Sequence, residues 1–168
     1  VTWDGKNIKG HNYAKHYEKY FSKFKSKKNL KILEIGSLIG ASAASFLNYF
    51  DDAHIFCCDV NPFQIKYNSN KISKLYINTR SKKILKETSN YFDFNFDIII
   101  DDGSHNKKDQ ILTLNYFLSK LNKGGIYVIE DTYEYLRVPV LNEDNLNYGV
   151  NDFIFLVFYN GDHCSYYL

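Results

Sequence analysis

A chain of 168 residues is long enough for one domain with a buried core, and its net charge of +2 is too small to indicate nucleic acid or a membrane surface as the partner. The three cysteines form no CxxC pair and no even set, so we expect no disulfide framework and a reducing, cytoplasmic location. The sequence has no signal peptide and no apolar stretch of the length that a membrane span needs.

Strand-like and helix-like segments alternate along the chain, which is typical of βαβ units. The first expected element is an N-terminal helix over 13–27. After it we expect, in chain order, a strand over 31–35, a helix over 42–49, a strand over 54–60, a short helix over 63–68, a weak strand over 75–78, a helix over 81–88, a strand over 96–100, a helix over 107–121 and a strand over 125–129.

The C-terminal part is predicted to be a loop over 133–147 and a hairpin of 153–159 with 162–167, because Asn160-Gly161 favours a tight turn. The whole order predicts an α/β fold, a doubly wound and mostly parallel sheet with helices on both faces and a C-terminal antiparallel hairpin. We expect a single domain over 1–168. Because the chain contains no Met even at position 1, we also expect it to be part of a longer chain, truncated at the C-terminus.

The first candidate site is the turn after the 31–35 strand. Gly36 and Gly40 let the backbone approach a ligand closely, and the helix that follows presents backbone N–H groups. The third glycine of the dinucleotide-binding motif is missing, so a nicotinamide-dependent oxidoreductase is disfavoured. With Glu34, this spacing suits a ligand that lacks phosphate, such as S-adenosylmethionine. A tight turn without a ligand is the alternative.

The second candidate is Asp59, at the end of the 54–60 strand. A carboxylate at this place can accept hydrogen bonds from both hydroxyls of a ribose. Its alternative role is a cap on the next helix.

Acidic residues follow both of the most apolar strands, 96–100 and 125–129; they are Asp101, Asp102, Glu130 and Asp131. Such strands are typical of a parallel sheet covered on both faces, where ligands bind at the carboxyl ends. The converging carboxylates would repel one another without a cation, so the pattern predicts a divalent metal ion and, without one, a raised pKa. His105, on the same loop as Asp102, is suited to accept a proton. Helix capping for the acids, and plain solvent exposure for the histidine, are the alternatives.

Four stretches carry a family resemblance. They are His11-x-Tyr13 with Tyr17-Glu18, Leu33-Glu34-Ile35-Gly36 with Gly40-Ala41-Ser42, Ile100-Asp101-Asp102-Gly103-Ser104-His105, and Gly124-Gly125-Ile126-Tyr127-Val128-Ile129-Glu130-Asp131-Thr132. With them the chain resembles class I S-adenosylmethionine-dependent methyltransferases, and among these the metal-dependent sugar O-methyltransferases of the macrocin and mycinamicin type.

The resemblance implies a Rossmann-like class I methyltransferase fold and a role for each site residue. Asp102, Glu130 and Asp131 would bind magnesium, and His105 would be the general base. The family's acidic residue near the adenine is replaced here by the Asn78-Thr79-Arg80 stretch. The candidate contacts to S-adenosylmethionine are Glu34, Gly36, Gly40, Ser42 and Asp59, with Asp101 either facing the cofactor or capping the next helix.

The implied function is magnesium-dependent O-methylation, by S-adenosylmethionine, of a hydroxyl on a sugar, a related polyol or a natural product. The partner would be a small-molecule acceptor, with neither nucleic acid nor a membrane, and the resemblance implies a homo-oligomer. Two alternatives stay open: a metal-independent small-molecule methyltransferase and a non-catalytic cofactor-binding module. A metal titration separates the first, and the intact acidic motifs argue against the second.

Overall fold

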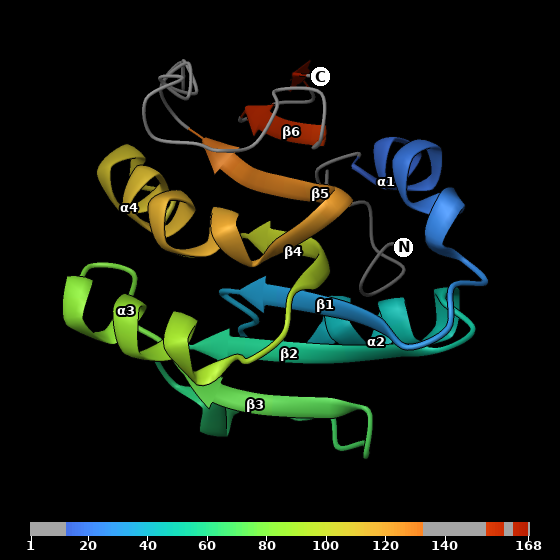
Figure 1. Ribbon diagram of the computed structural model, residues 1–168. Coiled ribbons are helices and arrows are strands. Elements are labelled where there is room, and N and C mark those ends of the chain that lie inside the picture. Colours follow the sequence, from blue (N-terminus) through green and yellow to red (C-terminus); the bar gives the residue numbers. More distant parts are fainter. Residues whose placement is uncertain (1–12, 133–153, 160–162, 168) are drawn as a thin grey trace, which may run out of the picture.

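The computed structural model describes residues 13–132, 154–159 and 163–167, so the loop predicted over 133–147 lies outside the described part of the chain. Its strands form one sheet in the order β3-β2-β1-β4-β5-β6-β7 (Figure 1). All neighbours from β3 to β6 pair in parallel. The strands are β1 (Leu30–Ile35), β2 (Ala53–Asp59), β3 (Ile72–Tyr76), β4 (Phe96–Asp101), β5 (Leu121–Thr132), β6 (Ile154–Tyr159) and β7 (His163–Tyr167).

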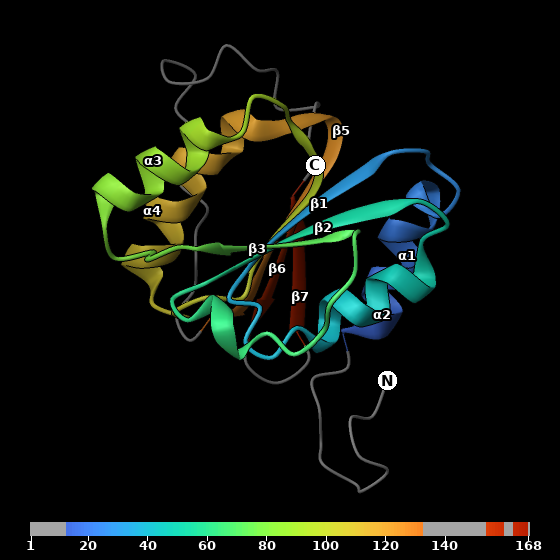
Figure 2. The ribbon, with the colours of Figure 1, turned by 90° about the horizontal axis from the view of Figure 1, so that it is seen from below.

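Helices cover both faces of this sheet. Figure 2 shows α1 and α2 on one face and α3 and α4 on the other. This three-layer arrangement is the doubly wound α/β fold that the alternating segments predict. The helices are α1 (Ala14–Phe21), α2 (Ala41–Tyr49), α3 (Lys82–Tyr91) and α4 (Lys107–Phe117), with short 3-10 turns η1 (Ser22–Phe24), η2 (Pro62–Gln64) and η3 (Leu118–Lys120).

The side-chain alternation of the strands divides the interior into two cores. Successive strand residues point to opposite faces, so neighbours in β1 join different cores. Ile32 packs on the α1 and α2 side with Phe46, whereas Leu33 packs on the α3 and α4 side with Phe117. Because the central strands bury both faces, they read as the continuous apolar runs seen in the sequence.

Several element boundaries differ from the expected ones. The N-terminal helix predicted over 13–27 ends at Phe21 and continues as the η1 turn. The helix predicted over 107–121 ends at Phe117, because η3 follows and Leu121 already pairs with Phe96 at the start of β5. Gly124, three residues after the expected end of this helix, therefore lies inside a strand, with a φ of 74°.

Strand β7 pairs antiparallel with β6, and β6 pairs in parallel with β5. The turn residues 160–162 of the predicted hairpin lie outside the described residues. No helix in the described ranges is both long and apolar enough to cross a membrane.

The strand order reverses between β1 and β4. The chain passes from β1 outward through β2 to β3, then crosses β1 to continue with β4 on its other side. In such sheets the loops after the two strands at this reversal diverge and leave a crevice at their carboxyl ends. The glycine turn follows β1 and the first acidic motif follows β4, so both lie at this crevice.

Candidate active site

The glycine turn and the acidic loop touch each other through the backbone. The Asp102 amide donates to the carbonyl of Ile35 at 2.9 Å, and the Gly36 amide donates to that of Cys58 at 2.8 Å. Gly36 has a φ of 90°, and a Cβ on it would lie 2.0 Å from the carbonyl oxygen of Asp102. Only glycine fits this position, because a side chain would be strained and would collide with backbone.

Asp59 is held at the crevice by hydrogen bonds from two loops. One carboxylate oxygen accepts from the amide of Leu38 at 2.9 Å, and the other accepts from the amide of Asn61 and the side chain of Gln64, both at 2.9 Å. Its alternative role as a helix cap is wrong, because the N-cap of η2 is Asn61 and no side chain caps this turn; Asp59 accepts from the amide of Asn61 and from the side chain of Gln64. The carboxylate is nevertheless fixed where it lines a cavity.

Glu34 is buried behind the glycine turn and is only 3% exposed. The hydroxyl of Ser42 donates to one of its carboxylate oxygens, so these two predicted cofactor contacts are brought together. The other oxygen has no hydrogen-bond partner among the described residues. Burial raises the pKa of this carboxyl group.

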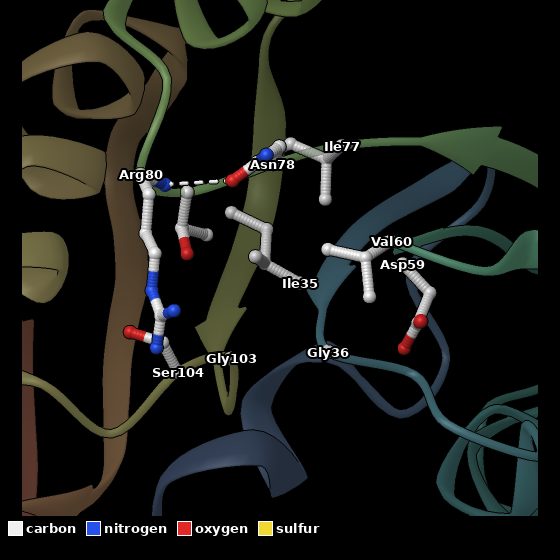
Figure 3. A pocket seen from close by; sticks show the side chains of 10 residues that line it. Ile35, Gly36, Asp59, Val60, Ile77, Asn78, Arg80, Gly103 and Ser104 are labelled. Carbon is white, nitrogen blue, oxygen red and sulfur yellow. Dashed lines mark hydrogen bonds between the residues drawn. The ribbon is translucent and has the colours of Figure 1, made fainter.

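Two cavities meet at Gly36. The smaller, of about 370 Å³, is shown in Figure 3, where Asp59 and Val60 face Arg80 and Ser104 across it. The Asn78 side chain accepts a hydrogen bond from the amide of Arg80 at 3.0 Å. These two residues belong to the stretch that replaces the family's acidic residue near the adenine. The mixture of apolar and hydrogen-bonding groups, with a carboxylate at one end, suits a nucleoside.

The larger cavity, of about 930 Å³, lies on the other side of Gly36. Its wall joins the glycine turn and α2 to the acids, so Glu34 and Ser42 share it with Asp102, Glu130 and Asp131. Gly40 is the N-cap of α2 and has a φ of 82°. A Cβ on it would lie 2.8 Å from the side chain of Ile65. A ligand that extends from the smaller cavity past Gly36 would reach the acidic cluster.

Three side chains could share a metal ion. Asp102, His105 and Asp131 each offer one ligand atom, and these atoms lie within 4.8 Å of one another. The His105 ring donates from Nε2 to a carboxylate oxygen of Asp102 at 3.0 Å, and this bond raises the pKa of the imidazole. His105 and Asp131 have positive φ values of 55° and 50°, a strained conformation that is concentrated at functional sites.

Glu130, the remaining predicted ligand, lies outside this group of three and bonds a tyrosine instead. Tyr17 donates its hydroxyl to Glu130, and Tyr13 donates to Asp131 at 2.6 Å. Burial and then the charge of Asp102 raise the pKa of Glu130 well above its usual value. Tyr13 and Tyr17 both belong to the first stretch that carries the family resemblance, but no pattern in the sequence predicts their contacts with these acids.

Asp101 does not cap the next helix, so that alternative is wrong. The cap of α4 is Asn106, whose side chain accepts from the amide of Lys108. Asp101 belongs to β4, is 1% exposed, and has one carboxylate oxygen without a partner among the described residues. Its burial raises the pKa to about 7. The other oxygen accepts from the amide of Gly103 at 3.2 Å, so Asp101 shapes the loop on which Asp102 stands.

The raised pKa of Asp101 predicts a pH-dependent cost to stability. The folded state keeps the proton up to about pH 7, whereas the unfolded chain releases it near pH 3.8, so stability falls as pH rises between these values. Asp101→Asn imitates the protonated form. We expect urea unfolding at pH 8 to find this variant about 2–4 kcal/mol more stable than the wild type, from about three pKa units at 1.4 kcal/mol each.

At about pH 4 the difference between the two proteins should vanish. A difference that stays constant from pH 4 to pH 8 would show that the Asp101 carboxyl group is ionised throughout.

Known proteins share this fold and these motifs. Residues 33–132 match the family model described as "Methyltransferase domain", a stretch that contains the glycine turn and both acidic motifs. The chain belongs to this methyltransferase family. The match covers more than half of the chain and confirms the class I methyltransferase resemblance.

Curated relatives of this methyltransferase chain come from Streptomyces. An L-olivosyl-oleandolide 3-O-methyltransferase of Streptomyces antibioticus is 28% identical over 135 residues, which are 73% of this chain and 33% of that protein. An 8-demethyl-8-alpha-L-rhamnosyl tetracenomycin-C 2'-O-methyltransferase of Streptomyces olivaceus is 24% identical over 128 residues, 72% of this chain and 33% of that protein. The chain thus spans about a third of the length of these relatives.

Among solved structures, the MycE methyltransferase of the mycinamycin biosynthetic pathway is similar to this chain. Its complex with Mg and SAH matches with a TM-score of 0.62 at 23% identity, over 71% of this chain and 32% of that one. A further complex of MycE contains mycinamycin VI and has a TM-score of 0.63. The likeness confirms the parallel sheet with its helices; it gives no support to the C-terminal hairpin.

Proposed function

We propose that this methyltransferase domain, comprising residues 1–168, transfers a methyl group from S-adenosylmethionine to a hydroxyl of a sugar, a related polyol or a natural product, with Mg²⁺ bound and His105 as the general base. The observation that carries the proposal is that Asp102 and Asp131 line the larger cavity beside the glycine turn, while His105 lies within metal-ligand distance of both and is hydrogen-bonded to Asp102. A cation site and a cofactor site would then share one cavity, with the base next to the cation site.

The two cavities fit the two halves of S-adenosylmethionine. The smaller one would hold the nucleoside, with the Asp59 carboxylate accepting from the ribose hydroxyls. The buried oxygen of Glu34 without a partner would accept from the α-ammonium group on the far side of Gly36. Because a Cβ on Gly36 would fill the close approach between the two loops, the cradle depends on this glycine.

The acidic cluster fits a magnesium ion. Asp102 and Asp131 supply the carboxylate oxygens that Mg²⁺ prefers, and Glu130 stands next in the chain to complete the set. The bound ion would lower the pKa of an acceptor hydroxyl, as metal ions do for water. Its charge would also offset the repulsion from Asp102, which adds to the effect of burial in raising the pKa of Glu130.

His105 is placed to receive the proton of the acceptor hydroxyl. A neutral imidazole has a single N–H, so donation from Nε2 to Asp102 makes Nδ1 the ring nitrogen that can accept a proton. The positive φ at His105 turns the ring back toward the acid that precedes it by three residues. This arrangement performs general base catalysis, while the cavity walls orient the hydroxyl toward the methyl group.

The acceptor class follows from the cavity and from the relatives. The larger cavity is lined by hydroxyls, carboxylates and aromatic rings, which together suit a glycosylated compound. The curated relatives are named as methyltransferases of sugar-bearing natural products. We therefore propose a sugar hydroxyl as the preferred acceptor. We also propose that the protein self-associates and that it is cytoplasmic.

Removal of magnesium should stop methyl transfer. We expect excess EDTA to lower the rate of S-adenosylhomocysteine release at least about 10²-fold, because a metal contributes several kcal/mol to the stabilisation of the transition state. L-Olivosyl-oleandolide and 8-demethyl-8-alpha-L-rhamnosyl tetracenomycin-C, the acceptors named for the two curated relatives, serve as substrates. Added Mg²⁺ should restore the rate.

Full activity in EDTA would establish the metal-independent alternative. Calorimetric binding of S-adenosylhomocysteine without transfer to any acceptor in a broad panel of sugars and phenols would instead favour the non-catalytic module.

A further inference from the structure

Helix α1 reaches the acidic cluster with two hydroxyl groups. Tyr13 precedes the helix and Tyr17 lies one turn later, so both face the same side. Tyr13 donates to Asp131 at 2.6 Å and Tyr17 donates to Glu130. The carboxylates of Asp131 and Glu130, at the end of β5, thus each accept a hydrogen bond from a tyrosine far away in sequence. The separations are 118 and 113 residues.

Both phenol rings are fixed by packing. Tyr13 is 6% exposed. The ring of Tyr17 stacks on Phe21 with centroids 4.6 Å apart and contacts Phe46 of α2 at 6.1 Å. A ring held on both sides has its hydroxyl in one place, so each hydrogen bond selects one orientation of its carboxylate.

The backbone between these acids is held from the opposite face of the sheet. Gln110 of α4 is 1% exposed and donates from its side chain to the carbonyl oxygen of Glu130 at 3.0 Å. Asp131 follows with its positive φ of 50°. Helices from both layers therefore fix this turn, α4 through the backbone and α1 through the side chains.

We propose that Tyr13 and Tyr17 are positioning residues that orient the Asp131 and Glu130 carboxylates for the divalent cation. The inference rests on the proposed function and extends it to α1. A hydrogen bond to one oxygen of a carboxylate leaves the other oxygen for the ion and restricts its direction. A phenol is suited to this place because it donates a hydrogen bond without adding a charge that would compete with the cation.

The test compares Tyr13→Phe and Tyr17→Phe with Tyr49→Phe. Each change removes one hydroxyl and keeps the ring; Tyr49 lies in α2 against Phe50, so its variant is the matched control. Mn²⁺ binding is followed by electron paramagnetic resonance in the presence of S-adenosylhomocysteine. We expect the Kd for Mn²⁺ to rise about 10–100-fold in the first two variants, as for other lost hydrogen bonds to metal ligands, and to stay within about 3-fold in the control.

A second readout separates positioning from folding. In EDTA, the melting temperature and the affinity for S-adenosylhomocysteine should stay near the wild-type values in the Tyr17→Phe variant, because the aromatic packing is kept. Unchanged Mn²⁺ affinity in both variants, alone or with a raised KM for the acceptor, would overturn the inference and leave the proposed function intact. A wild-type protein that binds no Mn²⁺ would overturn both.

Discussion

Replacement of His105 by Asn should lower methyl transfer by about 10²–10⁴-fold, the usual contribution of a general base. Asn is the sharper choice than Ala because His105 has a φ of 55°, a conformation that Asn tolerates well. The variant therefore keeps the loop and a polar side chain but cannot take the proton. His105→Ala should show at least the same loss. The measurement is kcat/KM for the acceptor, from the release of S-adenosylhomocysteine.

The affinity for S-adenosylhomocysteine should be unchanged in these variants, since the cavities that would hold it are lined by other residues. His54→Gln is the control, because His54 lies at the start of β2 and bonds Ser73, far from the acids in the sheet. Wild-type turnover by the His105 variants would remove the base assignment while leaving the cofactor and metal sites untested by it. A loss that both histidine positions share would indicate instability instead.

Gly36→Ala should destabilise the fold strongly. The new Cβ would lie 2.0 Å from the carbonyl oxygen of Asp102 and 2.8 Å from the Cα of Gly103, at a φ of 90°. Neither neighbour can move cheaply because both are backbone in the loop after β4. We expect the free energy of unfolding to fall by more than about 3 kcal/mol, and binding of S-adenosylhomocysteine to be lost, since Gly36 lines both cavities.

Gly124→Ala is the matched control for this variant. Gly124 has a φ of 74° but nothing within 4 Å of an added Cβ, so it reports only the backbone strain of about 1–2 kcal/mol. The excess loss at Gly36 then measures the contact between the two loops. Equal losses in urea unfolding would mean that the loop after β4 yields and that the cradle does not depend on close approach.

The sequence determined the fold because its signals are local. Apolar runs such as 96–100 and 125–129 mark strands buried on both faces, and their alternation with helical segments allows few topologies. The helix expected to reach Leu121 was too long, since the strand pairing of Leu121 with Phe96 prevailed over the helical pattern. That pairing connects residues distant in sequence, and no local pattern contains it.

The sequence also predicted the part of the site whose residues lie on one short loop. Asp102 and His105 are three residues apart, so their hydrogen bond needs only a tight turn. Parallel strands then place the end of β5 beside them, as the carboxyl-end rule predicts. The roles of the site residues remain predictions that the experiments above test.

Tertiary structure alone decided which neighbours each acidic side chain contacts. Asp101 and Asp102 are adjacent and chemically identical, but β4 buries the first without a full set of partners, whereas the second turns toward His105 and Asp131. The packing of α1 against the sheet decided that Tyr17 bonds Glu130 and Tyr13 bonds Asp131. These contacts join residues more than a hundred positions apart, and their geometry depends on how whole layers pack. Hydrophobic periodicity records which face of an element is buried, but not which atom of a distant element meets it.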